Sequence, residues 1–182
     1  MAYEVPALGT AGQVYTAAAH NIIVNDVIAI RNAQVNVQST TLTSATTMAV
    51  NTTPTNITGI TVTITPSTNT SKILLLVFAS IDNDSGVIGL TYSLARGGTA
   101  IGIGDAAGSR VRSTIDSFDM VGLKGAIILL DSPGTTSPVT YTLQVRCDSG
   151  TGTTYINRTK TDTNAVGTTR TISTITAIEI AV

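Results

Sequence analysis

Apolar and polar residues alternate with a period of two in one segment after another from about residue 33 onwards. The longest of these segments, residues 139–147, has Val, Tyr, Leu, Val and Cys separated by Thr, Gln and Arg. Shorter segments repeat the pattern at residues 33–38, 60–65, 90–94 and 177–182. Because successive side chains of a strand point to opposite faces, each segment predicts a strand with its apolar face on a core and its other face on solvent.

Turn-forming residues separate the predicted strands. Many strands with regular turns and few helices are typical of an all-β fold, and we predict an antiparallel β-sandwich of the jelly-roll type over residues 33–182. The lone Cys147 excludes an internal disulfide, and its place on the apolar side of a strand predicts a buried side chain. Clusters of turn residues occur at positions 66–69, 82–86, 96–98, 131–134, 148–150 and 162–167.

Two of the predicted strands are apolar on both faces. Residues 72–80 and 126–130 contain runs of Ile, Leu, Val, Phe and Ala without alternation. The outer face of an antiparallel sandwich is normally polar, so a doubly apolar strand indicates that its outer side is covered by another subunit. We predict a trimer interface formed by five of these side chains: Leu74, Leu76, Phe78, Ile127 and Leu129.

The first 32 residues differ from the rest and are predicted to form a separate attachment segment. Pro6 and two glycines favour an extended arm over residues 1–15, which would fray without a partner. In residues 16–32, Thr16 is a suitable N-cap, and apolar residues recur at helical spacing at positions 19, 23, 27 and 30. The pattern predicts a helix there, with a strand in part of it as the alternative. We expect the arm to contact a partner protein through Tyr3, Val5, Leu8, Val14 and Tyr15.

Charge is sparse in this chain. Charged residues make up 12% of it and the formal net charge is −1, against the ~25% charged residues of an average domain. A protein whose outer faces are covered by neighbours needs less surface charge, so the composition favours an assembling protein. The sequence has no clustered basic face for nucleic acid, no signal-peptide pattern and no apolar run long enough for a bilayer. We therefore expect no nucleic-acid or membrane partner, and synthesis in a cytoplasm followed by assembly.

The sequence does not bring together the residues of a catalytic or metal site. His20 is the only histidine and Cys147 the only cysteine, which are too few for a cysteine-based zinc site. Nothing near His20 indicates a nucleophile that it could activate. Residues 102–108 miss the spacing of a dinucleotide-binding loop, and we interpret them as a glycine-rich connection. We predict no catalytic residue, no cofactor and no metal.

Two other possibilities stay open. Residues 82–86 resemble the start of a calcium loop, although Val87 and Ser93 stand where that motif needs Gly and Glu. We interpret them as a turn, with weak cation binding as the alternative. Carboxylates such as Asp116 and Asp119 could meet others in space to cleave a glycoside. The chain has no Trp to grip a sugar face, so a sugar-active enzyme or lectin is the least favoured class.

Six segments carry a resemblance to a known group of proteins. They are residues 69–77, 94–105, 130–137, 140–144, 155–158 and 173–179. Taken in order, they resemble the jelly-roll domains of tailed-bacteriophage virion proteins, which occur in tail-fibre tips and in capsid decoration, or cement, proteins. Residues 12–18, followed by Asn21, resemble a short attachment segment near the start of phage structural proteins. The resemblance implies a homotrimer and carries no catalytic residues.

These features together predict a non-enzymatic capsid decoration protein of a bacteriophage virion. Residues 1–32 would grip neighbouring subunits of the major capsid protein, and the jelly-roll trimer of residues 33–182 would face outward and stabilise the head. The alternative is a tail fibre or receptor-binding tip. Its first 32 residues would dock on a tail or baseplate protein, and its distal loops, at 82–86, 105–114 or 148–154, would touch a host surface receptor.

Overall fold

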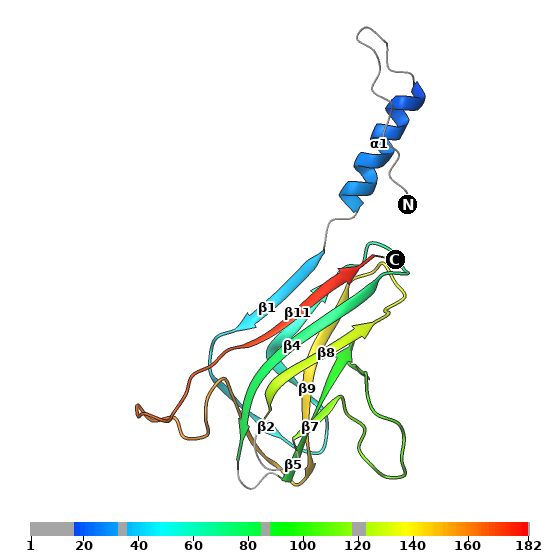
Figure 1. Cartoon of the computed structure of the whole chain (residues 1–182). Helices are drawn as coiled ribbons and strands as arrows, with labels where there is room; N and C mark the ends of the chain where they lie inside the picture. The colour runs from blue at the N-terminus through cyan, green and yellow to red at the C-terminus, as the bar shows by residue number, and fades with distance from the viewer. Residues whose placement is uncertain (1–16, 33–35, 85–87, 118–122, 182) are drawn as a thin grey trace. The chain divides into compact units, whose positions relative to one another are not determined.

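The computed structural model describes residues 17–32, 36–84, 88–117 and 123–181 (Figure 1). The chain divides into two compact units, Met1–Val35 and Asn36–Val182. The described part of the first unit is a helix, α1 (Ala17–Asn32), which confirms the predicted helix and excludes the strand alternative. The proposed N-cap and the arm residues lie outside the described residues: Thr16, Tyr3, Val5, Leu8, Val14 and Tyr15.

The described part of the second unit contains eleven strands in two antiparallel sheets. The first sheet contains β1 (Val37–Leu42), β2 (Thr46–Val50), β4 (Lys72–Asn83), β8 (Lys124–Asp131), β10 (Gly152–Ile156) and β11 (Ser173–Ile180). The second sheet contains β3 (Thr55–Ile64), β5 (Ile88–Arg96), β6 (Thr99–Ile101), β7 (Ile115–Ser117) and β9 (Val139–Ser149).

The order of the strands is that of a jelly roll. In the first sheet, β1 lies next to β11, β11 next to β4, and β4 next to β8, as the front of Figure 1 shows. In the second sheet, β3 lies next to β9, β9 next to β5, and β5 next to β7. Strands that are far apart in the chain therefore pair, the first with the last, as in a double Greek key. The predicted all-β jelly-roll sandwich is confirmed.

The core fills the space between the two sheets. The five apolar residues that alternate along 139–147 are all buried, as the sequence predicts. Cys147 at the end of this series is completely buried. Tyr92 of β5 and Tyr141 of β9 are among the largest fully buried side chains. Each such side chain stabilises the fold by roughly 1.5–3 kcal/mol when it leaves water, so the inward faces account for the stability of the sandwich.

A tight hairpin between β5 and β6 confirms one of the predicted turns. Gly97 and Gly98 connect Arg96 with Thr99, which pair across the hairpin. Their φ angles are 55° and 88°. A two-residue hairpin of this kind needs positive φ at both central positions, which glycine adopts without steric cost. The dipeptide thus sets the chain reversal that brings β6 back along β5.

Candidate interaction surface

The two sheets present outer faces of different character. On the second sheet, threonine hydroxyls pair between β3 and β9. The Oγ1 atoms of Thr61 and Thr142 lie 3.0 Å apart, and those of Thr63 and Thr140 lie 2.8 Å apart. A polar surface of this kind is normal for the side of a sheet that meets water. The outer side of the first sheet is instead apolar over β4 and β8.

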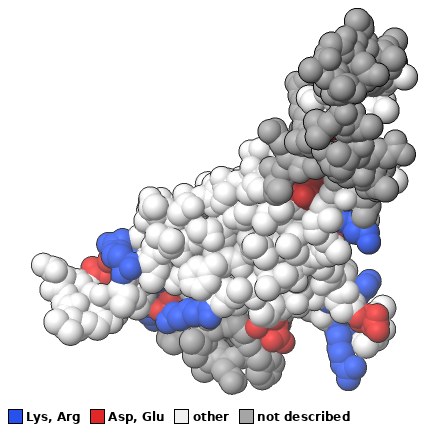
Figure 2. Space-filling view, turned by 45° about the horizontal axis from the view of Figure 1, so that its top comes forward, with Lys and Arg blue, Asp and Glu red and all other residues white. Residues whose placement is uncertain are grey.

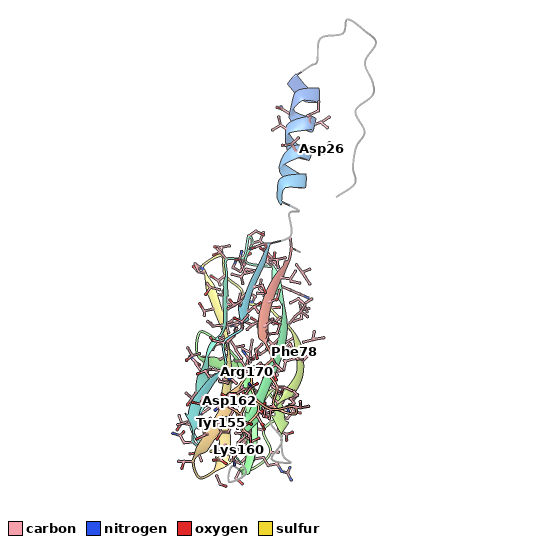
Figure 3. The ribbon with its side chains drawn as sticks, turned by 90° about the vertical axis from the view of Figure 1, so that its left-hand side faces the viewer. Asp26, Phe78, Tyr155, Lys160, Asp162 and Arg170 are labelled. Carbon is pink, nitrogen blue, oxygen red and sulfur yellow. The ribbon has the colours of Figure 1, made fainter. Side chains whose placement is uncertain are left out.

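Side chains of β4 and β8 oppose each other across the outer side of the first sheet. Ile128 is 70% exposed, Leu130 48% and Phe78 45%, and Figure 3 labels Phe78 at the margin of the sandwich. Leu74 and Leu76, between them, are half-buried. The antiparallel register gives three pairs: Leu74 with Leu130, Leu76 with Ile128, and Phe78 with Ala126.

The structure corrects two residues of the predicted trimer interface. Ile127 is only 6% exposed and belongs to the core, and Leu129 packs against that core. Both therefore point inward, and the prediction that they lie on the outer side is wrong. Every residue of 126–130 is apolar, so the sequence has no alternation that could distinguish the two sides. The pairing of β8 with β4 decides it, and places Ile128 and Leu130 outside.

The apolar surface continues onto β11 and β1 at one end of the sheet. Ile178 lies opposite Leu74, and Val37 lies opposite Ile178. Ile180 follows on the same side of β11. Val37 is 46% exposed and Ile180 is 40% exposed. The alternation at 33–38 and 177–182 predicts these residues on the core side, and this prediction is wrong.

The inward residues of β11 are instead Ser173, Ile175, Ala177 and Glu179, and the last of these needs an explanation. Glu179 is only 8% exposed, and burying a carboxylate is costly unless donors surround it. Ser67 donates to its Oε1 from N at 2.6 Å and from Oγ at 2.5 Å, and Ser71 Oγ donates to the same atom at 2.6 Å. Asn36 Nδ2 donates to Oε2 at 3.0 Å. These donors make the inward orientation of Glu179 possible, and its apolar neighbours then point outward.

The same cluster sets the protonation of Glu179 and fixes this end of the sheet. Burial raises the pKa of the carboxyl, but the hydrogen bonds from Ser67, Ser71 and Asn36 outweigh it and lower the pKa from 4.5 to about 2. The Asn36 carbonyl also accepts a bond from the Glu179 N–H at 2.9 Å. The connection between β3 and β4 and the start of β1 are thus both attached to β11. This attachment holds Val37, Ile178 and Ile180 in place on the outer side.

We term the resulting surface the outer apolar face. In the three rows of paired outward residues on β8, β4, β11 and β1, none is charged. Lys72 and Lys124 stand at its two ends, opposite Ile180 and Ser80. Figure 2 shows the corresponding side of the molecule, with a broad uncharged area and charges towards its rim. The outer apolar face consists of Val37, Leu74, Leu76, Phe78, Ala126, Ile128, Leu130, Ile178 and Ile180.

The outer apolar face is as large as the largest apolar patches of typical monomers, which are often functional. From their exposed fractions, five residues contribute roughly 500 Å², within the range of about 300–600 Å² for the largest apolar patches of typical monomers; they are Val37, Phe78, Ile128, Leu130 and Ile180. Threonine and serine side chains border it on β11 and β1, where the hydroxyls of Ser39 and Thr176 lie 2.8 Å apart. A broad apolar centre with an uncharged polar border is the composition of a protein–protein interface.

An ion pair anchors the end of β8 to the second sheet. Arg96 Nη1 donates to both carboxylate oxygens of Asp131, at 3.0 and 2.9 Å, and the Tyr141 hydroxyl donates to Asp131 at 2.7 Å. Burial, and then the neighbouring Asp131 carboxylate, raises the pKa of Tyr141, so the hydroxyl stays protonated and donating. The cluster joins β5, β8 and β9, and holds the strand that carries Ile128.

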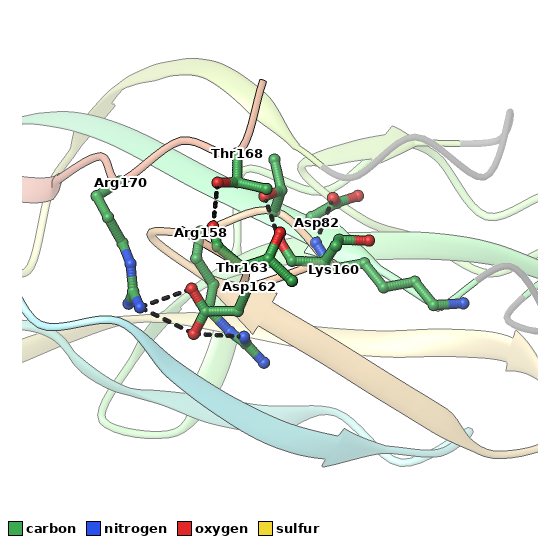
Figure 4. Close-up of polar contacts among 9 residues, drawn as sticks. Asp82, Arg158, Lys160, Asp162, Thr163, Thr168 and Arg170 are labelled. Carbon is green, nitrogen blue, oxygen red and sulfur yellow. Dashed lines mark hydrogen bonds and ion pairs between the residues drawn. The ribbon is translucent and has the colours of Figure 1, made fainter. Parts of the chain in front are cut away.

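The long connection between β10 and β11 forms the second conspicuous surface feature. Asp162 accepts from Arg158 at 2.9 Å and from Arg170 at 2.6 Å, as Figure 4 shows, and Figure 3 shows Asp162 and Arg170 near each other. The guanidinium of Arg158 also lies 4.8 Å from the ring centre of Tyr155. Within the connection, Val166 is completely exposed. Two arginines surround the single carboxylate of Asp162 at the base of the connection, whereas residues 163–169 at its tip contain no charged residue.

The segment that resembles a calcium loop is engaged by donors of the chain itself. Asp82 accepts a bond from the N–H of Lys160 at 2.9 Å and one from the N–H of Asn83 at 2.9 Å. The ammonium of Lys160 forms an ion pair with Asp84. Residues 85–87 lie outside the described residues. Among the residues that the structure describes, no group of three or more His, Cys, Asp or Glu side chains could hold a metal.

The other candidates for chemistry that the structure describes lie on separate elements. Asp116 lies in β7, opposite Thr91, whereas Asp119 is outside the described residues, so their pairing is not addressed. His20 belongs to α1. Residues 102–108 belong to the connection between β6 and β7, and the Arg112 side chain donates to the Gly104 carbonyl there at 2.6 Å. The outer apolar face is therefore the strongest candidate for a functional surface.

Comparison with known proteins does not assign the chain to a family. No model of a known protein family matches it, and no curated protein matches it in sequence. In the described part of the chain, no helix is both long enough and apolar enough to cross a membrane.

Proposed function

We propose that this protein is a non-enzymatic structural protein that acts as a homotrimer and decorates the capsid of a bacteriophage virion. The observation that carries the proposal is the outer apolar face, because it needs a cover that a single copy of the sandwich does not supply. The outer face of the second sheet is polar and can meet water. One face for neighbouring copies and one face for solvent suit an assembled shell component.

Burial of the outer apolar face can offset the costs of assembly. At about 25 cal/mol per Å², burying roughly 500 Å² of apolar surface on each copy corresponds to roughly 12 kcal/mol per copy before the costs of association. Those costs amount to about 4–15 kcal/mol. The polar border adds area towards the roughly 800 Å² per partner of a standard interface. The apolar gain from covering the whole face is thus of the same size as these costs.

The assignment to a phage capsid rests on the resemblance of the strand segments and on the separate first unit. Residues 1–15 would attach to the major capsid protein in the host cytoplasm, while the trimer of sandwiches faces outward. The protein would act without cofactor, metal, nucleic acid or membrane, by adding contacts between capsid subunits. Such contacts stabilise the assembled particle over its parts.

Deleting residues 1–15 tests the proposal. The shortened chain should keep the oligomeric mass of the full chain and should no longer co-sediment with capsids that lack the protein. Full-length chain added to the same capsids is the positive control. Binding of the shortened chain at full strength would contradict the role of the arm.

A tail fibre or receptor-binding tip is the second candidate, and the connection between β10 and β11 favours it. Its uncharged tip and the completely exposed Val166 could contact a host surface, and binding residues are often carried on loops. The number of copies per particle separates the two. Hundreds of copies support capsid decoration, whereas a few, or a few tens, support a fibre.

A further inference from the structure

We propose that the copies meet through β8 and β4, and that Ile128 lies beside the symmetry axis, against Ile128 of the neighbouring copy. This inference rests on the proposed self-assembly and specifies its geometry. The occupant of the outer apolar face is thus a second copy of this chain, placed on one half of that face.

The distribution of polar groups indicates which half of the outer apolar face the second copy covers. On β8 and β4, all three rows of paired outward residues are apolar. On β11 and β1, only the row of Ile178 and Val37 is apolar, and the next two rows carry hydroxyls. Ser39 and Thr176 already satisfy each other there by a hydrogen bond. The β11 side can therefore form a wet border, whereas the β8 side gains most from exclusion of water.

The position of β8 in the sheet independently favours the β8 side as the contact between copies. Among the described strands, β8 pairs only with β4 and so forms an edge. An edge strand of eight residues with an apolar outer side invites association with another chain. The charged residues at the two ends of β8 do not prevent association through its middle, because Asp131 is bound to Arg96 and Lys124 stands at the other end. A neighbouring copy on this side covers both the edge and the apolar rows.

Ile128 marks the centre of the contact. It is the most exposed of the large apolar residues of the outer apolar face, at 70%, and lies in the middle of β8 between Ala126 and Leu130, opposite Leu76. In a closed ring of identical subunits, the residues nearest the rotation axis meet their own copies. The side chain with most to gain from burial, surrounded by apolar neighbours, is the one expected at that place.

A cysteine at this position tests the inference in the full chain. Ile128→Cys should be cross-linked to its own copy by a short bismaleimide reagent, giving covalent dimers on a denaturing gel. In a trimer a single reagent molecule joins two cysteines, so about two of every three chains should shift. The native Cys147 is completely buried, so unchanged protein should give no product. Val166→Cys, at a completely exposed valine, is the control for random collision and should stay single.

The outcomes separate this inference from the proposed function. A native oligomer that is cross-linked at position 128 but not at 166 supports both. A native oligomer that gives no more product at 128 than at 166 keeps the self-assembly and overturns the placement of Ile128. A monomer that gives no specific product overturns both.

Discussion

Replacing Ile128 with aspartate should dissociate the assembled protein into single folded chains. Ile128 exposes 70% of its surface in the single chain, roughly 130 Å², and burying that area at about 25 cal/mol per Å² stabilises each contact by roughly 3 kcal/mol. The change removes this term and places a carboxylate in an apolar contact, which adds a desolvation cost. The dissociation constant of each contact should therefore rise by at least about a hundredfold.

Sedimentation velocity over a dilution series measures this effect, and circular dichroism checks that the strands are retained. The fold should survive, because residue 128 points away from the core in the single chain. Val166→Asp is the matched control: it introduces the same charge at a completely exposed valine and should leave the mass unchanged. If Ile128→Asp keeps the oligomeric mass down to nanomolar concentration, the outer apolar face is not the contact between copies.

Three further predictions concern stability. Glu179→Gln should lower the free energy of unfolding at pH 7 by about 3 kcal/mol, because hydrogen bonds hold the folded-state pKa of Glu179 at about 2, below its ordinary 4.5. A lowered pKa stabilises the fold fully above about pH 5 and progressively less towards pH 2. Urea unfolding should therefore show the free energies of unfolding of the wild type and the variant converging towards pH 2. A difference between them that does not vary with pH would refute this. Tyr141→Phe removes the hydroxyl that donates to Asp131 at 2.7 Å and should cost about 1–3 kcal/mol, and an unchanged urea midpoint would count against that bond. Asp162→Asn should cost about 1 kcal/mol, because the pair with Arg170 is exposed and contributes little, while the pair with the less exposed Arg158 contributes most of the loss. A large fall in melting temperature would show that the connection supports the fold.

The sequence predicts most of this fold because local rules and tertiary contacts agree over much of the chain. Alternation along 139–147 places its apolar residues on the core, as the structure has them. The glycine pair at 97–98 specifies the hairpin that forms. Along 139–147, burial of one face satisfies the alternation of apolar and polar residues.

The prediction of which side chains point to the core fails where both faces of a strand are apolar, or where the more apolar face turns out to be the outer one. Residues 126–130 give no sign of which side is inward, and only the register with β4 distinguishes Ile127 from Ile128. At 177–182 the alternation is clear but misleading. Glu179 turns inward because Ser67, Ser71 and Asn36, far away in the sequence, supply donors. No local rule contains that information.

The residues whose orientation was wrongly predicted nevertheless bear on function. An alternating strand that turns its isoleucines outward enlarges the same surface that the doubly apolar strands form. Ile178, Ile180 and Val37 extend the apolar area beyond β4 and β8 at one end. The surface is therefore larger than the five residues that the sequence alone indicates, which strengthens the reasoning for a covered face.

The native mass of the full chain at micromolar concentration tests the central claim most directly. Sedimentation equilibrium should give three times the chain mass of 18.7 kDa. A monodisperse particle of one chain mass would contradict the account.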